Sequence, residues 1–395
     1  AARRMQDRAL LLLRRELAVQ LLPDGGHEER SAAYHLLLLD RLVELGCCLA
    51  AIDGDRPVWL LQAIAAMGSW ARAVRLESGL APRFNDSAAD AAPPLDAVVA
   101  FAEGFLQCRP GPPGRGLRQA LLVAGNRHAA PALAACAPEP PGITDLPATG
   151  WTLLRPGHGW ELAFRCGTPC PSHLPSHVHS DQLSLELSHR GRWLLGEAGT
   201  SVYGLCPERA YERSGAAHNV LQLGVAAPDG AIRWIEPVQV WGAFRAGRKA
   251  RPRQRRCGWL PRGGCYAEGG HDGFDHRGAR HHRRVELTAV APQRLSLRLR
   301  DTVTTTSPLV FRIWWHLAPG CPQELLEALR LEAPTAGPVS AAWHTTWFAQ
   351  GFGRRSPRQS YCLSGSLAAG VHELLTVLPL SLPPPAAPLA CPASG

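Results

Sequence analysis

Polar and apolar residues alternate through one short stretch of the chain. The polar members are His177, His179 and Asp181, and leucines continue the alternation at 183, 185 and 187. Side chains two residues apart point to the same face of a β-strand. We therefore expect one strand whose apolar end faces a core and whose polar end opens into a cleft.

Two histidines and a carboxylate are sufficient ligands for a zinc-like ion. Glu197 follows on the next apolar segment, and the loop between the two strands decides whether it can join them. A three-residue loop with Gly191 in the left-handed conformation pairs Leu183 with Glu197 and brings Glu197 to the histidine face. A two-residue loop places Glu197 on the opposite face.

The same stretch resembles a known family. The segment HVHSDQLSLELSHRGRWLLGEAGTSVYG, followed by a YERSGAAHNV segment, is similar to the heparinase II/III-like polysaccharide lyases. Those proteins carry an H-x-H-x-D-x-L-S-F-x-L strand, a hairpin with G-T-x-x-Y and an R-S/T-x-A-H-N segment, in this order. The resemblance implies that His179, Glu197 and His218 hold a structural zinc ion. Asp181 either binds the ion or orients one of the histidines. Glu197 departs from the family, whose metal-binding members have Asp there.

A second resemblance lies near the start of the chain. The segment LLPDGGHEERSAAYHLLLLDRLVEL is similar to the helix that supplies a catalytic tyrosine in this family, and FNDSA at 84–88 resembles a further loop. Arg30 and Tyr34 are four residues apart, so we expect them to share a helix face. Thirty-three residues precede Tyr34 and none is Asn, whereas the family has an Asn-His pair there. We therefore expect the first helices of the family's toroid to be absent.

The implied reaction is the cleavage of an acidic polysaccharide by β-elimination. A base removes the proton at C5 of a uronate and the C4–O bond breaks, so the developing charge must be stabilised. On this interpretation Tyr34 is the base or the acid, with a pKa lowered by positive surroundings. His177 is a second base or contacts the carboxylate. Further side chains are expected to contact sugar: Arg30, Tyr203, Arg209, Tyr211, Arg213 and Asn219.

Composition and charge narrow the class of protein. Hydrophobic residues make up 46% and charged residues 19% of 395 residues, which is typical of a globular chain with room for two domains. The net charge is +9, and Lys249 is the only lysine. Arginine is suited to carboxylate and sulfate, and we expect an acidic polysaccharide partner and no nucleic acid. No apolar run is long enough for a transmembrane segment.

The elements that must position these residues change in kind along the chain. Helical patterns fill residues 1–140 and short alternating segments fill 141–380, followed by a Pro-rich tail at 381–395. These patterns predict an α+β protein in which helices are followed by an antiparallel β-sandwich. The family resemblance implies that the helices form an N-terminal partial (α/α) toroid. The helices are expected near 1–22, 31–52, 57–76 and 95–106, with shorter ones near 117–123 and 130–135.

Other interpretations remain open at this stage. The arginine-rich run 245–256 favours either a solvated hairpin or binding of a polyanion, and the histidines at 271–282 either structural roles or a second metal cluster. Cys166 and Cys170 could form a disulfide, join a metal site or have no joint role. A carbohydrate-binding protein that keeps the cleft without catalysis is the main alternative to a lyase. A metallohydrolase is a weaker one, because Gln182 stands where its motif needs histidine. The family resemblance favours the cell envelope, periplasm or secretion.

Overall fold

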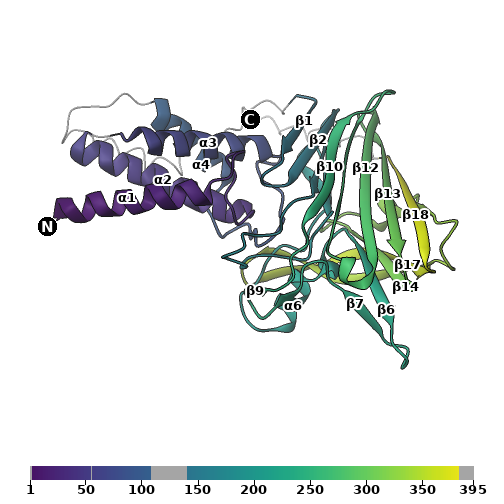
Figure 1. Cartoon of the computed structure of the whole chain (residues 1–395). Helices are drawn as coiled ribbons and strands as arrows, with labels where there is room; N and C mark the ends of the chain where they lie inside the picture. Colours follow the sequence, from purple (N-terminus) through teal and green to yellow (C-terminus); the bar gives the residue numbers. More distant parts are fainter. Residues whose placement is uncertain (1, 55, 108–139, 382–395) are drawn as a thin grey trace.

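The computed structural model describes residues 2–54, 56–107 and 140–381 (Figure 1). Helices form its first part and antiparallel sheets form the rest, as predicted. The expected helices near 117–123 and 130–135 and the tail from 382 lie outside the described residues. None of the described helices is both long and apolar enough to cross a membrane. Four helices match the predicted ones: α1 (Ala2–Gln20), α2 (Ala32–Asp53), α3 (Val58–Val74) and α4 (Leu95–Gln107).

Local signals explain where the second helix begins and ends. Ser31 is the N-cap of α2 and its side chain accepts a hydrogen bond from the Tyr34 amide, which satisfies one of the free donors of the first turn. Gly54 ends the helix in the left-handed conformation, with a φ of 69°. At Gly46 a Cβ would lie 2.5 Å from the Phe105 ring, so glycine permits the close approach of α2 and α4.

Three antiparallel sheets follow the helices. The first sheet has the order β1-β2-β3-β4-β5, with strands Gly142–Leu146, Trp151–Gly157, Trp160–Arg165, Leu185–His189 and Arg192–Leu195. The second has the order β10-β11-β12-β13-β18-β15, with strands Pro252–Trp259, Cys265–His271, Ala279–Ala291, Arg294–Thr305, Gly370–Ser381 and Arg330–Glu332. The third has the order β16-β17-β14-β6-β7, with strands Ser340–Gly351, Arg354–Leu367, Leu309–His316, Leu221–Ala226 and Ile232–Ile235.

Short elements connect these sheets. The helix α6 (Pro207–Arg213) lies beside a ribbon of β8 (Val240–Trp241) and β9 (Arg245–Ala246) in space (Figure 1), although β6 and β7 separate them in sequence. Three 3-10 turns, η1 (Gly215–Ala217), η2 (Asp275–Arg277) and η3 (Gln323–Leu326), complete the described elements.

Two hydrophobic cores show how the layers stack. One core joins the helices to one face of the first sheet, through Trp151, Leu153 and Ala163. The other joins the opposite face of that sheet to the second and third sheets, through residues such as Leu162 and Leu185. The first sheet thus separates the helices from the sandwich (Figure 1). The site described below lies where loops from both sides of this sheet meet.

Candidate functional site

The histidine segment is irregular backbone rather than the predicted strand. His177 has a φ of 56° and Leu183 a φ of 62°, both in the left-handed region. Each such residue turns the chain, so side chains two apart no longer share a face. The hydrogen-bonded strand β4 begins only at Leu185. The expectation of one continuous face from His177 to Leu187 was therefore wrong, although the leucines at 183, 185 and 187 are all buried.

The hairpin that leads to Glu197 differs from both predicted forms. His189 pairs with Arg192, so the turn is the two residues Arg190 and Gly191, whose φ values of 49° and 72° suit a tight hairpin. A register shift then places Leu187 opposite Leu195. This bulge reverses the one-residue slip that a two-residue turn introduces. Glu197 therefore reaches the end of the sheet where His218 lies. This is the position that the three-residue loop predicted, although the turn itself has two residues.

A buried aspartate, Asp86, lies at the centre of the site. Its Oδ2 accepts hydrogen bonds from His177 Nδ1 at 3.0 Å and Arg209 Nη2 at 2.6 Å. Its Oδ1 accepts from His179 Nε2 at 2.7 Å and from Thr200 Oγ1 at 3.1 Å. Burial alone would raise the pKa of Asp86, but the hydrogen bonds from His177, His179 and Arg209 hold this pKa well below its usual range. Asp86 lies within the FNDSA segment, and the sequence alone did not predict its central place.

The loop that carries Asp86 is fixed by the residue before it. Asn85 is fully buried, and its Nδ2 donates to the carbonyls of Glu29, Arg30 and Pro169 at 3.2 Å each. Its amide donates to Asp181 Oδ2, and its Oδ1 accepts from the His179 amide. Asn85 also has a φ of 57°, a conformation that Asn tolerates better than most residues. The FNDSA resemblance was the one signal in the sequence that pointed to this loop.

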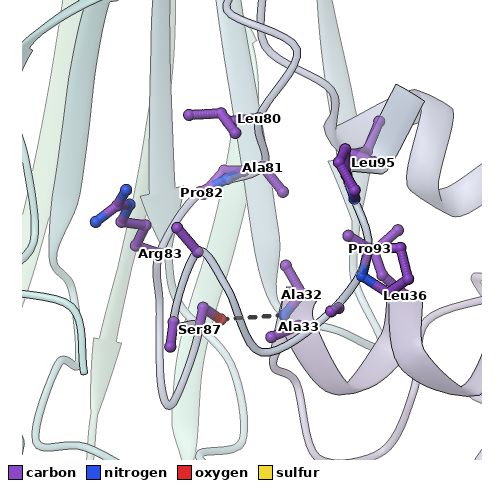
Figure 2. A pocket seen from close by; sticks show the side chains of 14 residues that line it. Ala32, Ala33, Leu36, Leu80, Ala81, Pro82, Arg83, Ser87, Pro93 and Leu95 are labelled. Carbon is purple, nitrogen blue, oxygen red and sulfur yellow. Dashed lines mark hydrogen bonds between the residues drawn. The ribbon is translucent and has the colours of Figure 1, made fainter. Parts of the chain in front are cut away.

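The start of α2 holds the same loop from the other side. Figure 2 shows Ser87 facing Ala32, where Ser87 Oγ accepts a hydrogen bond from the Ala32 amide. Ser31 Oγ donates to the Asp86 carbonyl at 2.6 Å. The pocket between the loop and the helix has a volume of only about 60 Å³, which suits packing rather than a ligand. The position of Tyr34 on α2 is thereby coupled to that of Asp86.

Tyr34 and His177 come together as the sequence predicted, and Tyr203 joins them. The two phenol oxygens of Tyr34 and Tyr203 are 2.8 Å apart, and the rings of Tyr34 and His177 have centroids 4.1 Å apart. The His177 side chain is 16% exposed. Burial raises the pKa of Tyr34, although the hydrogen bond from Tyr203 opposes this. The expected lowering of the Tyr34 pKa is therefore not found, and both phenols are protonated at neutral pH.

The remaining predicted sugar contacts divide into two groups. Arg209 lies at the cluster, but its guanidinium pairs with both Asp86 oxygens and with the Ala243 carbonyl, and it is 1% exposed. Tyr211 packs on Trp347 of β16 with ring centroids 4.4 Å apart. Arg209 therefore supports the cluster from the connection after β5, whereas Tyr211 packs against the third sheet.

Three predicted contacts are committed to the protein interior. Arg30 precedes α2 with a φ of 55°, so it does not share a helix face with Tyr34, and its Nη1 donates to the Glu28 carbonyl. Arg213 is 1% exposed and donates to the carbonyls of Val178, Gly242 and Arg245. Asn219 is 2% exposed, donating to the Leu185 carbonyl and accepting from the His316 amide. The sequence patterns could not show this burial.

The predicted metal ligands lie close together and are fully buried. His179 and His218 have ring centroids 5.3 Å apart, and Glu197 contacts His218 Nδ1 and Ser184 Oγ. His179 Nδ1 and His218 Nε2 are buried and have no hydrogen-bond partner in the described part of the chain, which suits a cation between the two rings. However, no group of three or more His, Cys, Asp or Glu among the described residues is arranged to hold a metal ion. As it stands, Glu197 orients the His218 ring.

Several residues of the other open sequence features have partners within the chain. Asp301 accepts hydrogen bonds from His281 and Arg283 inside the sandwich, and His271 Nδ1 accepts from the Gly273 amide. Cys166 and Cys170 are both free and buried, so they form no disulfide. In the basic run, Arg253 pairs with Asp275 and Arg255 with Asp145, so part of its charge is balanced within the chain.

Comparison with known proteins agrees with this architecture. Residues 138–370 match the family described as "Heparinase II/III-like, C-terminal". No curated protein matches the sequence. A crystal structure of heparinase III is 16% identical with a TM-score of 0.68, covering 94% of this chain and 57% of its own. A mutant of the heparan sulfate lyase HepC from Pedobacter heparinus is 15% identical with a TM-score of 0.63, covering 93% and 55%.

These comparisons bear on the fold and the family, and at such identities the structural likeness concerns the fold alone. The chain spans about half the length of the solved structures that it matches. The family match covers more than half of the chain and includes the histidine segment, the hairpin and the connection to His218. The chain therefore belongs to the heparinase II/III-like family.

Proposed function

We propose that this chain carries an active site of a polysaccharide lyase, which cleaves an acidic glycan by β-elimination. One observation supports the proposal above others: the Tyr34 hydroxyl, the Tyr203 hydroxyl and the partly exposed His177 ring meet beside a buried ion pair of Asp86 and Arg209. These are an acid and a base of the kind that proton transfer to and from a uronate requires.

The hydrogen bonds suggest a role for each group. His177 Nδ1 donates to the Asp86 carboxylate, which leaves the lone pair on Nε2 to accept the C5 proton. As that proton leaves, the double bond forms between C4 and C5, and the C4–O bond breaks with its electron pair on oxygen. Tyr34, protonated because burial raises its pKa, donates its proton to that leaving oxygen. Tyr203 holds the Tyr34 hydroxyl in place.

One observation favours the alternative of a carbohydrate-binding protein that retains the cleft. A lyase must neutralise the sugar carboxylate, and Arg209 already pairs with Asp86 through both nitrogens. If no other cation of the chain reaches the substrate, sugar binds without turnover. The two functions differ in product formation but share the binding step.

The proposal includes a structural zinc ion held by His179 and His218, with Glu197 as a ligand or as the residue that orients His218. Such an ion would hold the wall of the cleft. Elemental analysis of the purified protein should find stoichiometric zinc that is lost in His218→Ala, whereas His344→Ala, an exposed histidine, should keep it. Zinc absent from the wild type after growth and purification with added zinc would contradict this part. The proposal also places the protein in the envelope or periplasm, or outside the cell.

The substrate class can be measured directly. Unsaturated uronate absorbs in the ultraviolet, so the chain is incubated with heparan sulfate, alginate, polyglucuronate and an envelope polysaccharide. We expect the absorbance to rise with one polymer. Mass spectrometry should show that the products together have the mass of the substrate, because elimination adds no water. Because the chain spans about half of its structural relatives, the same assay is run on a version extended upstream. Binding without any rise in both versions would favour the binding protein.

A further inference from the structure

The outer face of the third sheet carries a groove that shares no residue with the Asp86 cluster. Its volume is about 390 Å³, and strands β7, β14, β16 and β17 contribute to it. Two tryptophans, Trp234 and Trp314, lie in its lining together with Arg312 and His344, and no Asp or Glu lines it. A groove that combines aromatic faces with a single guanidinium suits a ligand that is partly apolar and negatively charged.

Arg312 is held in a fixed position within this groove. The guanidinium lies over the Trp234 ring at 3.8 Å from its centroid and over the Trp314 ring at 5.1 Å. Its Nε donates to Gln222 Oε1 at 2.7 Å, and Gln222 is itself oriented because its Nε2 donates to Glu236 Oε1. Stacking uses the faces of the guanidinium, and no hydrogen bond of either Nη atom occurs among the described residues. Both Nη nitrogens therefore remain as donors for an anion.

The neighbouring strands keep the groove open and polar at one end. A Cβ at Gly224 would lie 3.0 Å from the Trp234 ring, so glycine allows this ring to lie close over β6. Arg312 is opposite Ser364, which is opposite Ser340, and the two hydroxyls are 2.9 Å apart. A row of hydroxyls thus extends from the guanidinium across β17 and β16.

We infer that this groove is a second, non-catalytic binding site for an acidic oligosaccharide, in which Arg312 pairs with a uronate carboxylate or a sulfate and Trp234 contacts the apolar face of the sugar ring. The inference rests on the proposed function for the class of polymer. It does not require the chain to cleave that polymer. Such a site would hold a long chain on the protein while the cleft engages another part of it.

The test measures binding in a Tyr34→Phe background, so that cleavage does not interfere. Size-defined oligosaccharides of heparan sulfate and of its unsulfated precursor are titrated by calorimetry. A neutral glucan oligosaccharide is the control ligand. The variants are Arg312→Gln, Arg312→Lys and Trp234→Ala, and Arg298→Gln removes an exposed arginine from β13 as the matched control.

Both Arg312 variants are expected to weaken binding at the groove at least about tenfold, which appears as the loss of one binding site per chain. Lysine keeps the charge but not the fork, so its failure would show that two in-plane donors are needed. Trp234→Ala should weaken the same site, and Arg298→Gln should have no effect. If Trp234→Ala misfolds, the test relies on Arg312→Lys, whose midpoint of thermal unfolding should equal that of the wild type.

Unchanged affinity and stoichiometry in all three groove variants would overturn the inference. Equal binding of the neutral glucan would also overturn it, because the guanidinium would then have no role. These results are separable from the proposed function. A chain that forms no unsaturated product can still lose a binding site when Arg312 is replaced, and an active lyase can bind oligosaccharide equally well with or without Arg312.

Discussion

At the scale of single residues, the site depends on the Asp86 carboxylate, whose partners lie far away in the sequence. Asp86 contacts His177, His179 and Arg209, which lie 91, 93 and 123 residues further along the chain. The histidines could be predicted because they stand close together in a recognisable segment. Asp86 could not, because its importance follows from long-range contacts that only the folded chain creates.

We expect Asp86→Asn to lower the free energy of unfolding by about 3–5 kcal/mol at neutral pH, because Arg209 would be left as an unpaired buried charge. Urea denaturation at equilibrium measures this change. Asp229→Asn, in the exposed turn after β6, is the matched control and should change the free energy little. An equally small effect of Asp86→Asn would mean that the pair contributes little to folding.

The same variant carries a pH signature. The folded pKa of Asp86 lies well below the ordinary value of 3.8, so its contribution is complete above that value and is lost as the pH falls below it. Wild-type protein should therefore lose stability more steeply than Asp86→Asn as the pH is lowered below about 3.8. Parallel curves for the two proteins would contradict the depressed pKa.

At the scale of secondary structure, the sequence predicted the helices well because caps and breakers are local. The expected ranges 31–52 and 57–76 agree closely with α2 and α3, whose ends are marked by Ser31, Gly54 and Pro57. The predicted strand through His177 is wrong because two residues with positive φ break the alternation. Histidine signals this conformation only weakly, and leucine does not signal it at all. The register shift between β4 and β5 was also missed, because no glycine or other local signal marks it.

Ser31 caps α2 and also donates a hydrogen bond to the loop that carries Asp86, so its replacement should affect both the helix and the loop. We expect Ser31→Ala to cost about 1–2 kcal/mol of unfolding free energy, through the lost cap of α2 and the lost bond to the Asp86 carbonyl. Chemical denaturation measures it, with the exposed Ser172→Ala as control. If the protein is a lyase, kcat should fall more than KM rises. A Ser31→Ala protein as stable as the control would argue against this link.

At the scale of the whole molecule, one sheet supports both the helices and the sandwich. The order of helices followed by strands was readable from the change in periodicity, and the sandwich class followed from it. The packing of the helices on the first sheet could not be predicted from the sequence, because it depends on which face of β2 each side chain occupies. Trp151 of β2 is fully buried between Trp70 and Phe84, with ring centroids 5.3 and 5.2 Å away.

Trp151→Ala should therefore destabilise the protein by about 3–5 kcal/mol and loosen the helices from the sheet. Thermal denaturation followed by circular dichroism, with limited proteolysis of the helical part, detects both effects. Trp259→Ala, at a ring that is 56% exposed, is the control and should leave both readouts near those of the wild type. Unchanged proteolysis in Trp151→Ala would show that other contacts hold the helices in place.

The most direct test of the account replaces one hydroxyl in the site. Tyr34→Phe removes the proposed proton donor, and the hydrogen bond to Tyr203 with it, while keeping the ring against His177. The rate of unsaturated product formation is measured on the polymer that the wild type cleaves, with Tyr266→Phe in β11 as control. If Tyr34 is the proton donor, we expect Tyr34→Phe to lower the rate of product formation at least about 100-fold while glycan binding is retained. The control variant should keep the wild-type rate. A Tyr34→Phe protein that cleaves at the wild-type rate would contradict the proposed active site.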